Sequence, residues 1–393
     1  MRILVSLVFA LAFSAAPAAA QTRLTNPEAP SWDRISRFSG EAEFQRYLRD
    51  TREAARRARA LSRGKQGAPE ECPPEFYPCA SPMDEQANEQ IVVTGSRISA
   101  APAPSAPSAS SVTNVQNAGV DEGDIVKLYG RFLIVLQDGR LFSVDTGAAP
   151  GALALVDRID VYRARHRGGW YDEILIAENR VVVTGYNYTE NATEFSVFSI
   201  SEDGRFTRES TYFLSSDDYY DNENYASRLV NGNLVIYTPL AVYNANAGRN
   251  PRWPIVRRWL SDGERAAQTT PGRPLFNASE IHRPIQSTFD PVIHTISVCP
   301  LGSARGGDEL ECRSTALVAP PGREFYVSTS HIYLWTYPVY NGQHVTHYAD
   351  RCRVGEDRFA AAAPAAIFQI PLEGGAPSAQ FIGGRPYDQL SMD

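Results

Sequence analysis

The residues with the clearest potential for chemistry form a run of carboxylates and tyrosines from Ser215 to Tyr225, SSDDYYDNENY. Carboxylate oxygens are ligands that Ca²⁺ prefers, and phenol rings stack on sugars or peptides. The spacing does not match an EF-hand, and a solvated loop between strands has the same composition. Calcium is the one cofactor considered, and the candidate binding residues are Asp217, Asp218, Tyr219, Tyr220, Asp221 and Glu223.

A second candidate is an insertion rich in arginine, proline and tryptophan, from Asn246 to Pro274. Tryptophan and arginine often anchor protein interfaces, so the segment fits a partner-binding loop. It fits equally well a loop that covers the edge of a neighbouring sheet. Both interpretations stay open, and the candidate contact residues are Arg252, Trp253, Arg257, Arg258 and Trp259.

Two smaller clusters point to structure more than to chemistry. Asp121, Glu122 and Asp124 are expected to cap turns at the entry to a strand region. On a strand, His344 and His347 would point to opposite faces, which disfavours a shared metal ion, and a loop is an equally open location for them. We therefore assign no metal ligand.

Motifs for catalysis are missing from the sequence. It contains no GxSxG, P-loop, GxGxxG or HExxH pattern. We assign no catalytic residue, and the balance leans against an enzyme.

The N-terminus predicts export. Arg2 precedes an apolar run from Ile3 to Phe13, and small residues end the segment at Ala20. This is the pattern of a cleaved signal peptide over residues 1–20. No later stretch is apolar and long enough for a transmembrane helix.

The charge of the chain excludes one class of partner. The formal net charge is -7, and loss of Arg2 with the signal peptide makes it about -8. Nucleic-acid binding requires a basic face, so we expect no nucleic-acid partner.

Five cysteines fit an oxidising compartment. Cys72 and Cys79 flank a proline-rich loop, and Cys299 and Cys312 flank a glycine-rich loop, so each pair is a candidate disulfide. Cys352 is left over, and three alternatives stay open: it is free, it pairs differently, or its partner is missing.

The N-terminal part divides into a helical segment, residues 21–63, and a linker, residues 64–112. Ser39 to Arg63 predicts a helix whose thin apolar stripe of Phe44, Leu48 and Leu61 can dock on a larger domain. Within the Pro/Ala/Ser-rich linker, Gln90 to Ile98 resembles a segment at the start of many TonB-dependent outer-membrane receptors, which indicates a Gram-negative envelope.

Four twelve-residue segments repeat in the second part of the chain. Each has a short strand, a polar turn and a more apolar strand, and they begin at Ile125, Ile174, Ser227 and Phe325. A period near 50 residues is typical of β-propeller blades, which stack on each other to bury both faces. The double interval before the last segment predicts a hidden copy, best placed at Val292 to Val298. Later strands of the same blades are expected at 141–144, 195–200 and 366–370.

Two segments carry a family resemblance. Thr113 to Gln116 is TNVQ, and Gly119 to Lys127 is GVDEGDIVK. Together they resemble the opening of the secreted β-propeller domain family distantly related to WD-40 repeats, with Gly123 standing where the family often has alanine. The resemblance covers residues 113–393 and the upstream helix, and it implies no agreed catalytic residue.

We therefore predict an all-β fold, a β-propeller of four-stranded blades over residues 113–393, preceded by a helix and a linker. This length accommodates five to six blades at ~50 residues each. Gln389 to Asp393 is similar to a family segment that further blades follow. An incomplete ring in a fragment of a longer propeller is therefore expected, with a smaller complete propeller as the alternative.

The favoured function is a binding or scaffold module, secreted or periplasmic, with a protein or saccharide ligand of the envelope. The alternative is an envelope hydrolase, which carboxylates or histidines from several blades around a channel mouth would favour. The sequence assigns no oligomeric state.

Overall fold

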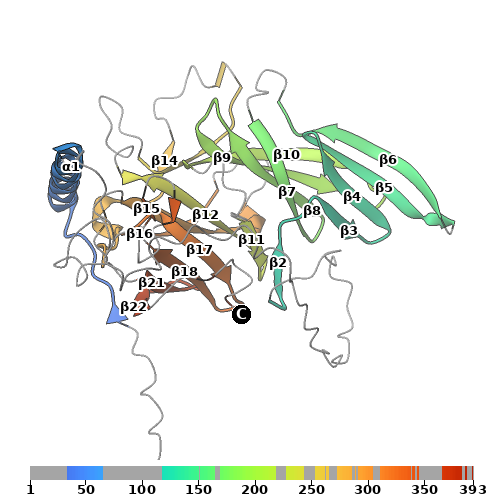
Figure 1. Cartoon of the computed structure of the whole chain (residues 1–393). Coiled ribbons are helices and arrows are strands. Elements are labelled where there is room, and N and C mark those ends of the chain that lie inside the picture. Colours follow the sequence, from blue (N-terminus) through green and yellow to red (C-terminus); the bar gives the residue numbers. More distant parts are fainter. Residues whose placement is uncertain are drawn as a thin grey trace, which may run out of the picture.

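The computed structural model describes residues 33–64, 117–149, 151–163, 169–217, 227–242, 253–261, 263–264, 272–285, 288, 291–303, 310–337, 339–340, 343–344, 365–382, 386 and 392. These residues form one α-helix and four large antiparallel sheets, which lie in chain order from the right to the lower left of Figure 1. We call the sheets blades 1 to 4.

Blades 1 and 2 are built from consecutive strands. Blade 1 contains β3 (Val126–Tyr129), β4 (Phe132–Gln137), β5 (Arg140–Ala149) and β6 (Ala152–Asp160). Blade 2 contains β7 (Gly169–Ala177), β8 (Arg180–Asn187), β9 (Ala192–Ile200) and β10 (Phe206–Ser215). Two further strands, β13 (Ile255–Arg258) and β14 (Arg273–Pro274), extend blade 2 beyond β10.

Blades 3 and 4 each take one strand from a distant part of the chain. Blade 3 contains β11 (Ser227–Val230), β12 (Asn233–Ala241), β15 (Val292–Pro300) and β16 (Arg313–Ala319), with β2 (Val120–Glu122) beside β11. Blade 4 contains β17 (Gly322–Val327), β18 (His331–Tyr337), β21 (Ala365–Pro371) and β22 (Ser378–Ile382), with β1 (Asp33–Arg34) beside β22. The short elements are η3 (Ala278–Glu280), η4 (Leu301–Ser303), β19 (Val339–Tyr340) and β20 (Gln343–His344).

The repeat confirms the fold class, with one correction. Each of the four repeated segments forms the first hairpin of a blade, and the predicted later strands are β5, β9 and β21. The hidden copy at Val292 to Val298 is wrong, because these residues form β15, the third strand of blade 3. The double interval arises because the chain leaves blade 3 after β12 and adds β13 and β14 to blade 2.

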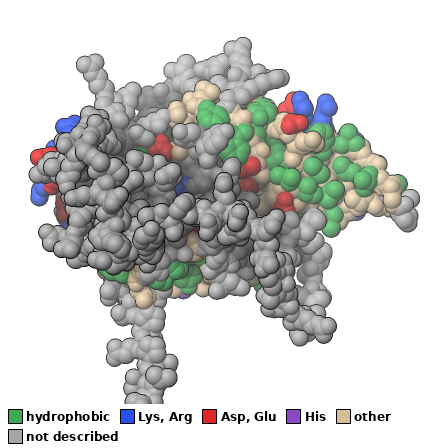
Figure 2. Space-filling model, in the orientation of Figure 1, with side chains coloured by type: hydrophobic (Ala, Val, Ile, Leu, Met, Phe, Trp, Pro, Cys, Tyr) green, Lys and Arg blue, Asp and Glu red, His purple; other side chains and the backbone are tan. Residues whose placement is uncertain are grey.

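The described residues thus form four blades, where the length of the segment predicted five to six, and their ring is not closed. Hydrophobic side chains gather on the surface over blade 1 in Figure 2. Leu153 and Leu155 of β6 are 68% and 63% exposed. One outer face of the stack is therefore apolar and uncovered by another blade in the described part of the chain.

Alternating side chains stack each blade on the next. In β9, Phe195 and Val197 belong to the core shared with blade 3, whereas Phe198 and Ile200 belong to the core shared with blade 1. A third cluster, which includes Phe325 of blade 4, joins blades 3 and 4. Because successive residues of a strand point to opposite faces, both faces of blade 2 are buried.

The helix α1 (Glu41–Gly64) docks on the edge of the blades, as its apolar stripe predicted. Phe44 and Leu48 are 0% and 1% exposed, and the Phe44 ring meets Trp253 edge to face, with centroids 5.8 Å apart. The side chain of Leu61 lies outside the described residues.

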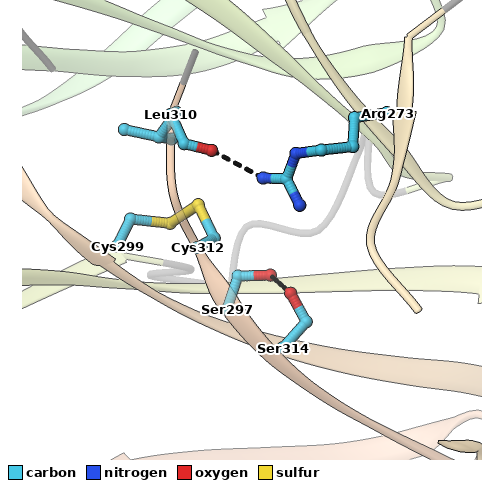
Figure 3. The surroundings of a disulfide bond; sticks show 6 residues. All are labelled: Arg273, Ser297, Cys299, Leu310, Cys312 and Ser314. Atoms are coloured by element: carbon cyan, nitrogen blue, oxygen red, sulfur yellow. Dashed lines mark hydrogen bonds between the residues drawn. A yellow bond between two sulfur atoms is a disulfide. The ribbon is translucent and has the colours of Figure 1, made fainter. Parts of the chain in front are cut away.

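One of the two candidate disulfides is present. Cys299 at the end of β15 is bonded to Cys312, just before β16, and this closes the hairpin that these two strands form (Figure 3). The Oγ atoms of Ser297 and Ser314 are 2.8 Å apart in the same ladder, and Arg273 Nη2 donates to Leu310 O at 2.6 Å. Cys72, Cys79 and Cys352 lie outside the described residues.

Replacing both Cys299 and Cys312 with serine should lower the free energy of unfolding by about 2 kcal/mol, because the disulfide limits the conformations of the unfolded chain. Urea unfolding of the oxidised wild type and the double variant measures the difference. Equal midpoints and equal slopes would contradict a stabilising disulfide.

Candidate functional site

The family-like segment lies along the first strands of all four blades. We call Asn117 to Lys127 the inner segment. Asn117 Nδ2 donates to the Tyr326 hydroxyl of β17 at 2.8 Å, and β2 then pairs with β11 of blade 3. Asp124 bridges Ile174 of β7 in blade 2, after which the chain enters β3 of blade 1. The inner segment therefore ties the blades together where their first strands meet.

The inner segment carries half of a buried charge cluster. Lys127 Nζ lies 2.6 Å from Asp121 Oδ1 and donates to Glu122 O at 2.5 Å. Arg228 of β11 lies 3.8 Å from Glu122 Oε1 and donates to Ser227 O at 2.9 Å. The side chains of Lys127 and Arg228 are 1% and 2% exposed. We define this group, together with Glu173 of β7, as the inner charge cluster.

Glu173 is the most enclosed acid of the cluster. One carboxylate oxygen accepts hydrogen bonds from Ser227 Oγ at 2.5 Å and Thr184 Oγ1 at 3.1 Å, while Oε1 has no partner among the described atoms. Burial raises the pKa of Glu173, and burial also raises the pKa of Asp121 although Lys127 opposes it. A Cβ at Gly123 would lie 2.5 Å from Glu173 Cδ, which explains why glycine suits this position.

The inner charge cluster corrects the role expected for the acidic motif. Asp121 and Glu122 do not act mainly as turn caps, because they face the buried cations Lys127 and Arg228. Asp124 has a local role of the expected kind, since its Oδ1 accepts the Ile125 N–H at 2.7 Å. Paired and buried charges of this kind position strands.

A second polar group lines an open hollow beside blade 2. The enclosed part of the hollow is small, with a volume of about 10 Å³, which is room for about one water molecule. We call it the inter-blade hollow. One of its lining residues, Arg163, comes just after β6 of blade 1, and the others belong to the face of blade 2 that blade 1 partly covers or to the segment after β13. Its lining residues are Arg163, Tyr171, Asn187, Glu194, Phe213 and Trp259.

Glu194 forms the buried acidic part of the hollow. Its two oxygens accept hydrogen bonds from the Tyr171 hydroxyl and Asn187 Nδ2, both at 2.8 Å. Burial raises the pKa of Glu194, with both neutral donors and two nearby arginines opposing the shift. The carboxylate of Glu194 is thus hydrogen-bonded by neutral donors, and Arg208 and Arg163 act on it only through longer-range electrostatics.

The insertion brings Trp259 to this hollow. Strand β13 pairs with β10, and the backbone N–H of Trp259 donates to Thr211 O at 2.8 Å. The guanidinium of Arg163, from the connection after β6, lies over the Trp259 ring at 3.7 Å from its centroid. Trp259 Nε1 is buried without a hydrogen-bond partner among the described atoms. The ring is therefore held by its backbone and by stacking.

The other candidates from the insertion have structural contacts. Trp253 Nε1 donates to Phe276 O at 2.8 Å, and its ring packs beside the core that α1 completes. Arg257 lies over the Phe213 ring and is 2.5 Å from Glu190 Oε2. Arg258 pairs in register with Tyr212, and Arg252 lies outside the described residues. The insertion thus covers the edge of blade 2 and also supplies one wall of the hollow.

The carboxylate and tyrosine run is described only at its start. Asp217 Oδ2 accepts the Ala241 N–H at 2.8 Å, and Asp217 N donates to Pro239 O. The calcium and ligand interpretations of this loop stay predictions, because its other candidates lie outside the described residues, namely Asp218, Tyr219, Tyr220, Asp221 and Glu223. His347 also lies outside them, and the described residues contain no group of three side chains suited to a metal ion.

The sequence interpretation missed Arg163, Glu194 and Glu173. The available indication was a glutamate within a strand segment rich in apolar and aromatic residues, Glu194 in ATEFSVFSI and Glu173 in GWYDEILIA. Arg163 gave no such indication, because it lies in a connection, and only the stacking of blades 1 and 2 brings it to Trp259.

The stacked four-stranded sheets, joined by an inner segment and carrying a surface hollow, define an open β-propeller. The chain belongs to the β-propeller domain family, whose model matches residues 110–393. A comparison with curated proteins finds no match. Among the described helices, none is both long and apolar enough to cross a membrane. A rigid propeller that presents loops and inter-blade surfaces supports a binding or scaffold type of module.

Proposed function

We propose that this chain is an exported β-propeller of a Gram-negative envelope, periplasmic or secreted, that binds a protein or saccharide ligand as a scaffold module. The apolar N-terminal segment supports export, and the Cys299–Cys312 disulfide fits an oxidising compartment. The family membership supports the binding role.

The observation that carries the proposal is the inter-blade hollow. A segment inserted between two strands of blade 3 crosses to blade 2 and places Trp259 against Arg163. Tryptophan and arginine are the side chains that contribute most often to binding energy at interfaces. The backbone N–H of Trp259 donates to Thr211 O, and Arg163 stacks on the indole ring, so contacts within the chain hold both side chains beside each other.

The hydrolase alternative gains no comparable support. Carboxylates from several strands do gather in the inner charge cluster, which is the arrangement that would favour it. They are paired with Lys127 and Arg228, whose side chains are almost fully buried. A buried ion network has no room for a substrate, so binding is the better account.

Trp259→Ala should remove ligand capture. The tagged mature protein and the variant are incubated with envelope extract and with purified cell-wall saccharide, and the bound material is compared. Phe381→Ala is the matched control, because Phe381 is an exposed aromatic residue of blade 4, at 52% exposure. We expect capture at least tenfold lower with Trp259→Ala and unchanged with Phe381→Ala.

The test uses a single substitution and not a deletion of the whole insertion. A deletion would also remove Trp253, whose ring packs against Phe44 and Phe276. Loss of capture in such a deletion would report misfolding. Equal capture by Trp259→Ala and the wild type, with both proteins folded by circular dichroism, would refute the hollow as the binding site.

A further inference from the structure

The outer face of blade 1 carries a row of aliphatic side chains that crosses the whole sheet. Its members lie opposite each other in successive strands, in the order Leu128, Leu133, Val144 and Leu155. Residues that pair directly across neighbouring strands share one face of a sheet. A single apolar row therefore runs from β3 to β6, and Leu155 at its end is 63% exposed.

This row belongs to none of the three cores that hold the blades together in the described part of the chain. In β4, Ile134 and Leu136 belong to the core shared with blade 2, whereas Leu133 and Val135 alternate with them and face the other way. The hydrophobic surface over blade 1 in Figure 2 agrees with this division. Blade 1 thus has a second apolar face of the kind that blades 2 and 3 bury against their neighbours.

Charged side chains lie at one end of this face. Arg140 of β5 forms an ion pair with Asp160 of β6, with 2.9 Å between Nε and Oδ1, and their side chains are 45% and 68% exposed. Arg158, which lies opposite Phe142, is also exposed. An apolar centre with a polar, solvent-accessible rim is typical of protein interfaces. The rim carries charges of both signs, so an identical face would not meet uniform repulsion.

The edge of blade 1 is open as well. In blades 2 and 4 the last strand of the blade is covered by a further strand, since β10 pairs with β13 and β22 pairs with β1. Among the described strands, β6 pairs only with β5. Its first four residues, ALAL, are exposed and include no charge and no proline, which are the residues that usually protect an edge strand. The edge therefore adds to the face as a surface suited to a partner.

A second copy of this chain supplies the matching surface. Blades of this fold bind each other by packing sheets face to face, so a blade face fits another blade face. The outer face of blade 4 is the less suitable match, because its cross-strand row is partly polar and consists of Tyr326, Tyr333, Gln369 and Ser378. The outer face of blade 1 is uncharged at its centre and can pack on its own copy around a twofold axis.

The size of the face predicts a dimer that dissociates on dilution. Four strands spaced ~4.8 Å apart, each about six residues long at ~3.3 Å per residue, give a footprint of about 400 Å². Two copies would bury about 800 Å² through these faces, which is close to the lower limit of about 1,000 Å² for specific interfaces. Leu153, which is 68% exposed, lies beside the row and adds to this area.

We propose that this chain forms a twofold-symmetric dimer in which the outer faces of blade 1 in two copies pack against each other. The row from Leu128 to Leu155 forms the buried centre of the interface, and the Arg140–Asp160 pairs lie at its rim. The inter-blade hollow lies on the other side of blade 1, toward blade 2. Dimerisation and ligand binding therefore use separate surfaces.

Sedimentation velocity of the mature protein over a range of concentrations tests the dimer. Leu155→Glu and Leu153→Glu each place a charge at the interface, and both positions are exposed enough to leave the fold intact, which circular dichroism checks. We expect each to raise the Kd of the dimer at least tenfold. Phe381→Glu is the matched control, because it adds the same charge at an exposed apolar position of blade 4, and it should leave the Kd unchanged.

Three results would overturn the inference. The first is a wild type that stays monomeric at its highest soluble concentration, as expected if another segment of this chain or a different protein covers the face. The second is a dimer with the same Kd in both folded leucine variants, and the third is a dimer that Phe381→Glu weakens equally. Trp259→Ala should keep the dimer, so the ligand site and the dimer are tested separately.

Discussion

Replacing Lys127 with methionine is expected to lower the free energy of unfolding by about 3–5 kcal/mol, because a buried charge would lose its partner. Lys127 is 1% exposed and lies 2.6 Å from Asp121, whose pKa burial already raises. Without the ammonium group, Asp121 must either stay charged in a poorly solvated place or take up a proton. Both outcomes destabilise the contact between the inner segment and blade 3.

Urea unfolding of the oxidised protein measures this effect. Arg205→Met is the matched control. Arg205 and Asp203 form an ion pair in which both side chains are 66% exposed, so its loss should leave the unfolding midpoint nearly unchanged. The double variant Lys127→Met with Asp121→Asn should recover part of the loss, because it removes both charges. A Lys127→Met variant as stable as the control would contradict a structural role for the inner charge cluster.

Acid should destabilise the protein through His294 by about 3 kcal/mol between pH 7 and pH 4. His294 is 0% exposed, and burial, with a contribution from Arg323, lowers its pKa to about 3. Its Nε2 lies 2.9 Å from Pro320 O, and its Nδ1 lies 2.7 Å from the Tyr237 hydroxyl. A carbonyl only accepts, so Nε2 carries the proton of a neutral ring and Nδ1 accepts from tyrosine.

The sign follows from proton uptake. Below the ordinary histidine pKa of ~6.5, His294 is protonated in the unfolded chain but stays neutral in the folded protein. Acid therefore favours unfolding until the pH nears 3. The loss is about 1.4 kcal/mol for each pH unit within this window. Glu173 and Glu194 act in the opposite direction, because their raised pKa values make the folded state bind protons more readily.

The contribution of His294 is therefore measured as the difference in pH-dependent stability between the wild type and a variant that lacks this histidine. Urea unfolding at pH 7, 5.5 and 4 is compared between the wild type and His294→Gln, whose amide can donate to Pro320 O and accept from Tyr237. The variant should be less sensitive to acid than the wild type, whatever its stability at pH 7. Parallel pH profiles would show that His294 does not carry the effect.

The inner segment gives a physical meaning to the family-like motif. Its residues contact the first strands of blades 4, 3 and 2 through Asn117, β2 and Asp124, and the segment then continues into β3, the first strand of blade 1. Buried charges in such a place favour one register over others, because a shifted strand would leave Lys127 or Arg228 without its acid. The motif therefore accounts for how the blades are joined.

The periodicity of the sequence determined the blades themselves. Short strands with polar turns, such as Asn231-Gly232 with both residues at positive φ, form hairpins from local preferences alone. The apolar stripe of Phe44 and Leu48 predicted a docked helix, and the glycine-rich loop between Cys299 and Cys312 predicted their disulfide. These features depend on neighbours in the chain, so a pattern within a few turns suffices to predict them.

Only the tertiary structure decided which distant segments share a sheet. The inserted strand β13 pairs with blade 2 although it follows β12 of blade 3 in the chain. This insertion doubles one repeat interval, which is why the sequence wrongly predicted a hidden copy. The same crossing brings Trp259 to Arg163, and the passage of β2 beside β11 brings Glu122 to Arg228. Hydrogen bonding between distant strands and the desolvation of buried charges determine these pairings. Neither effect leaves a periodic pattern in the sequence.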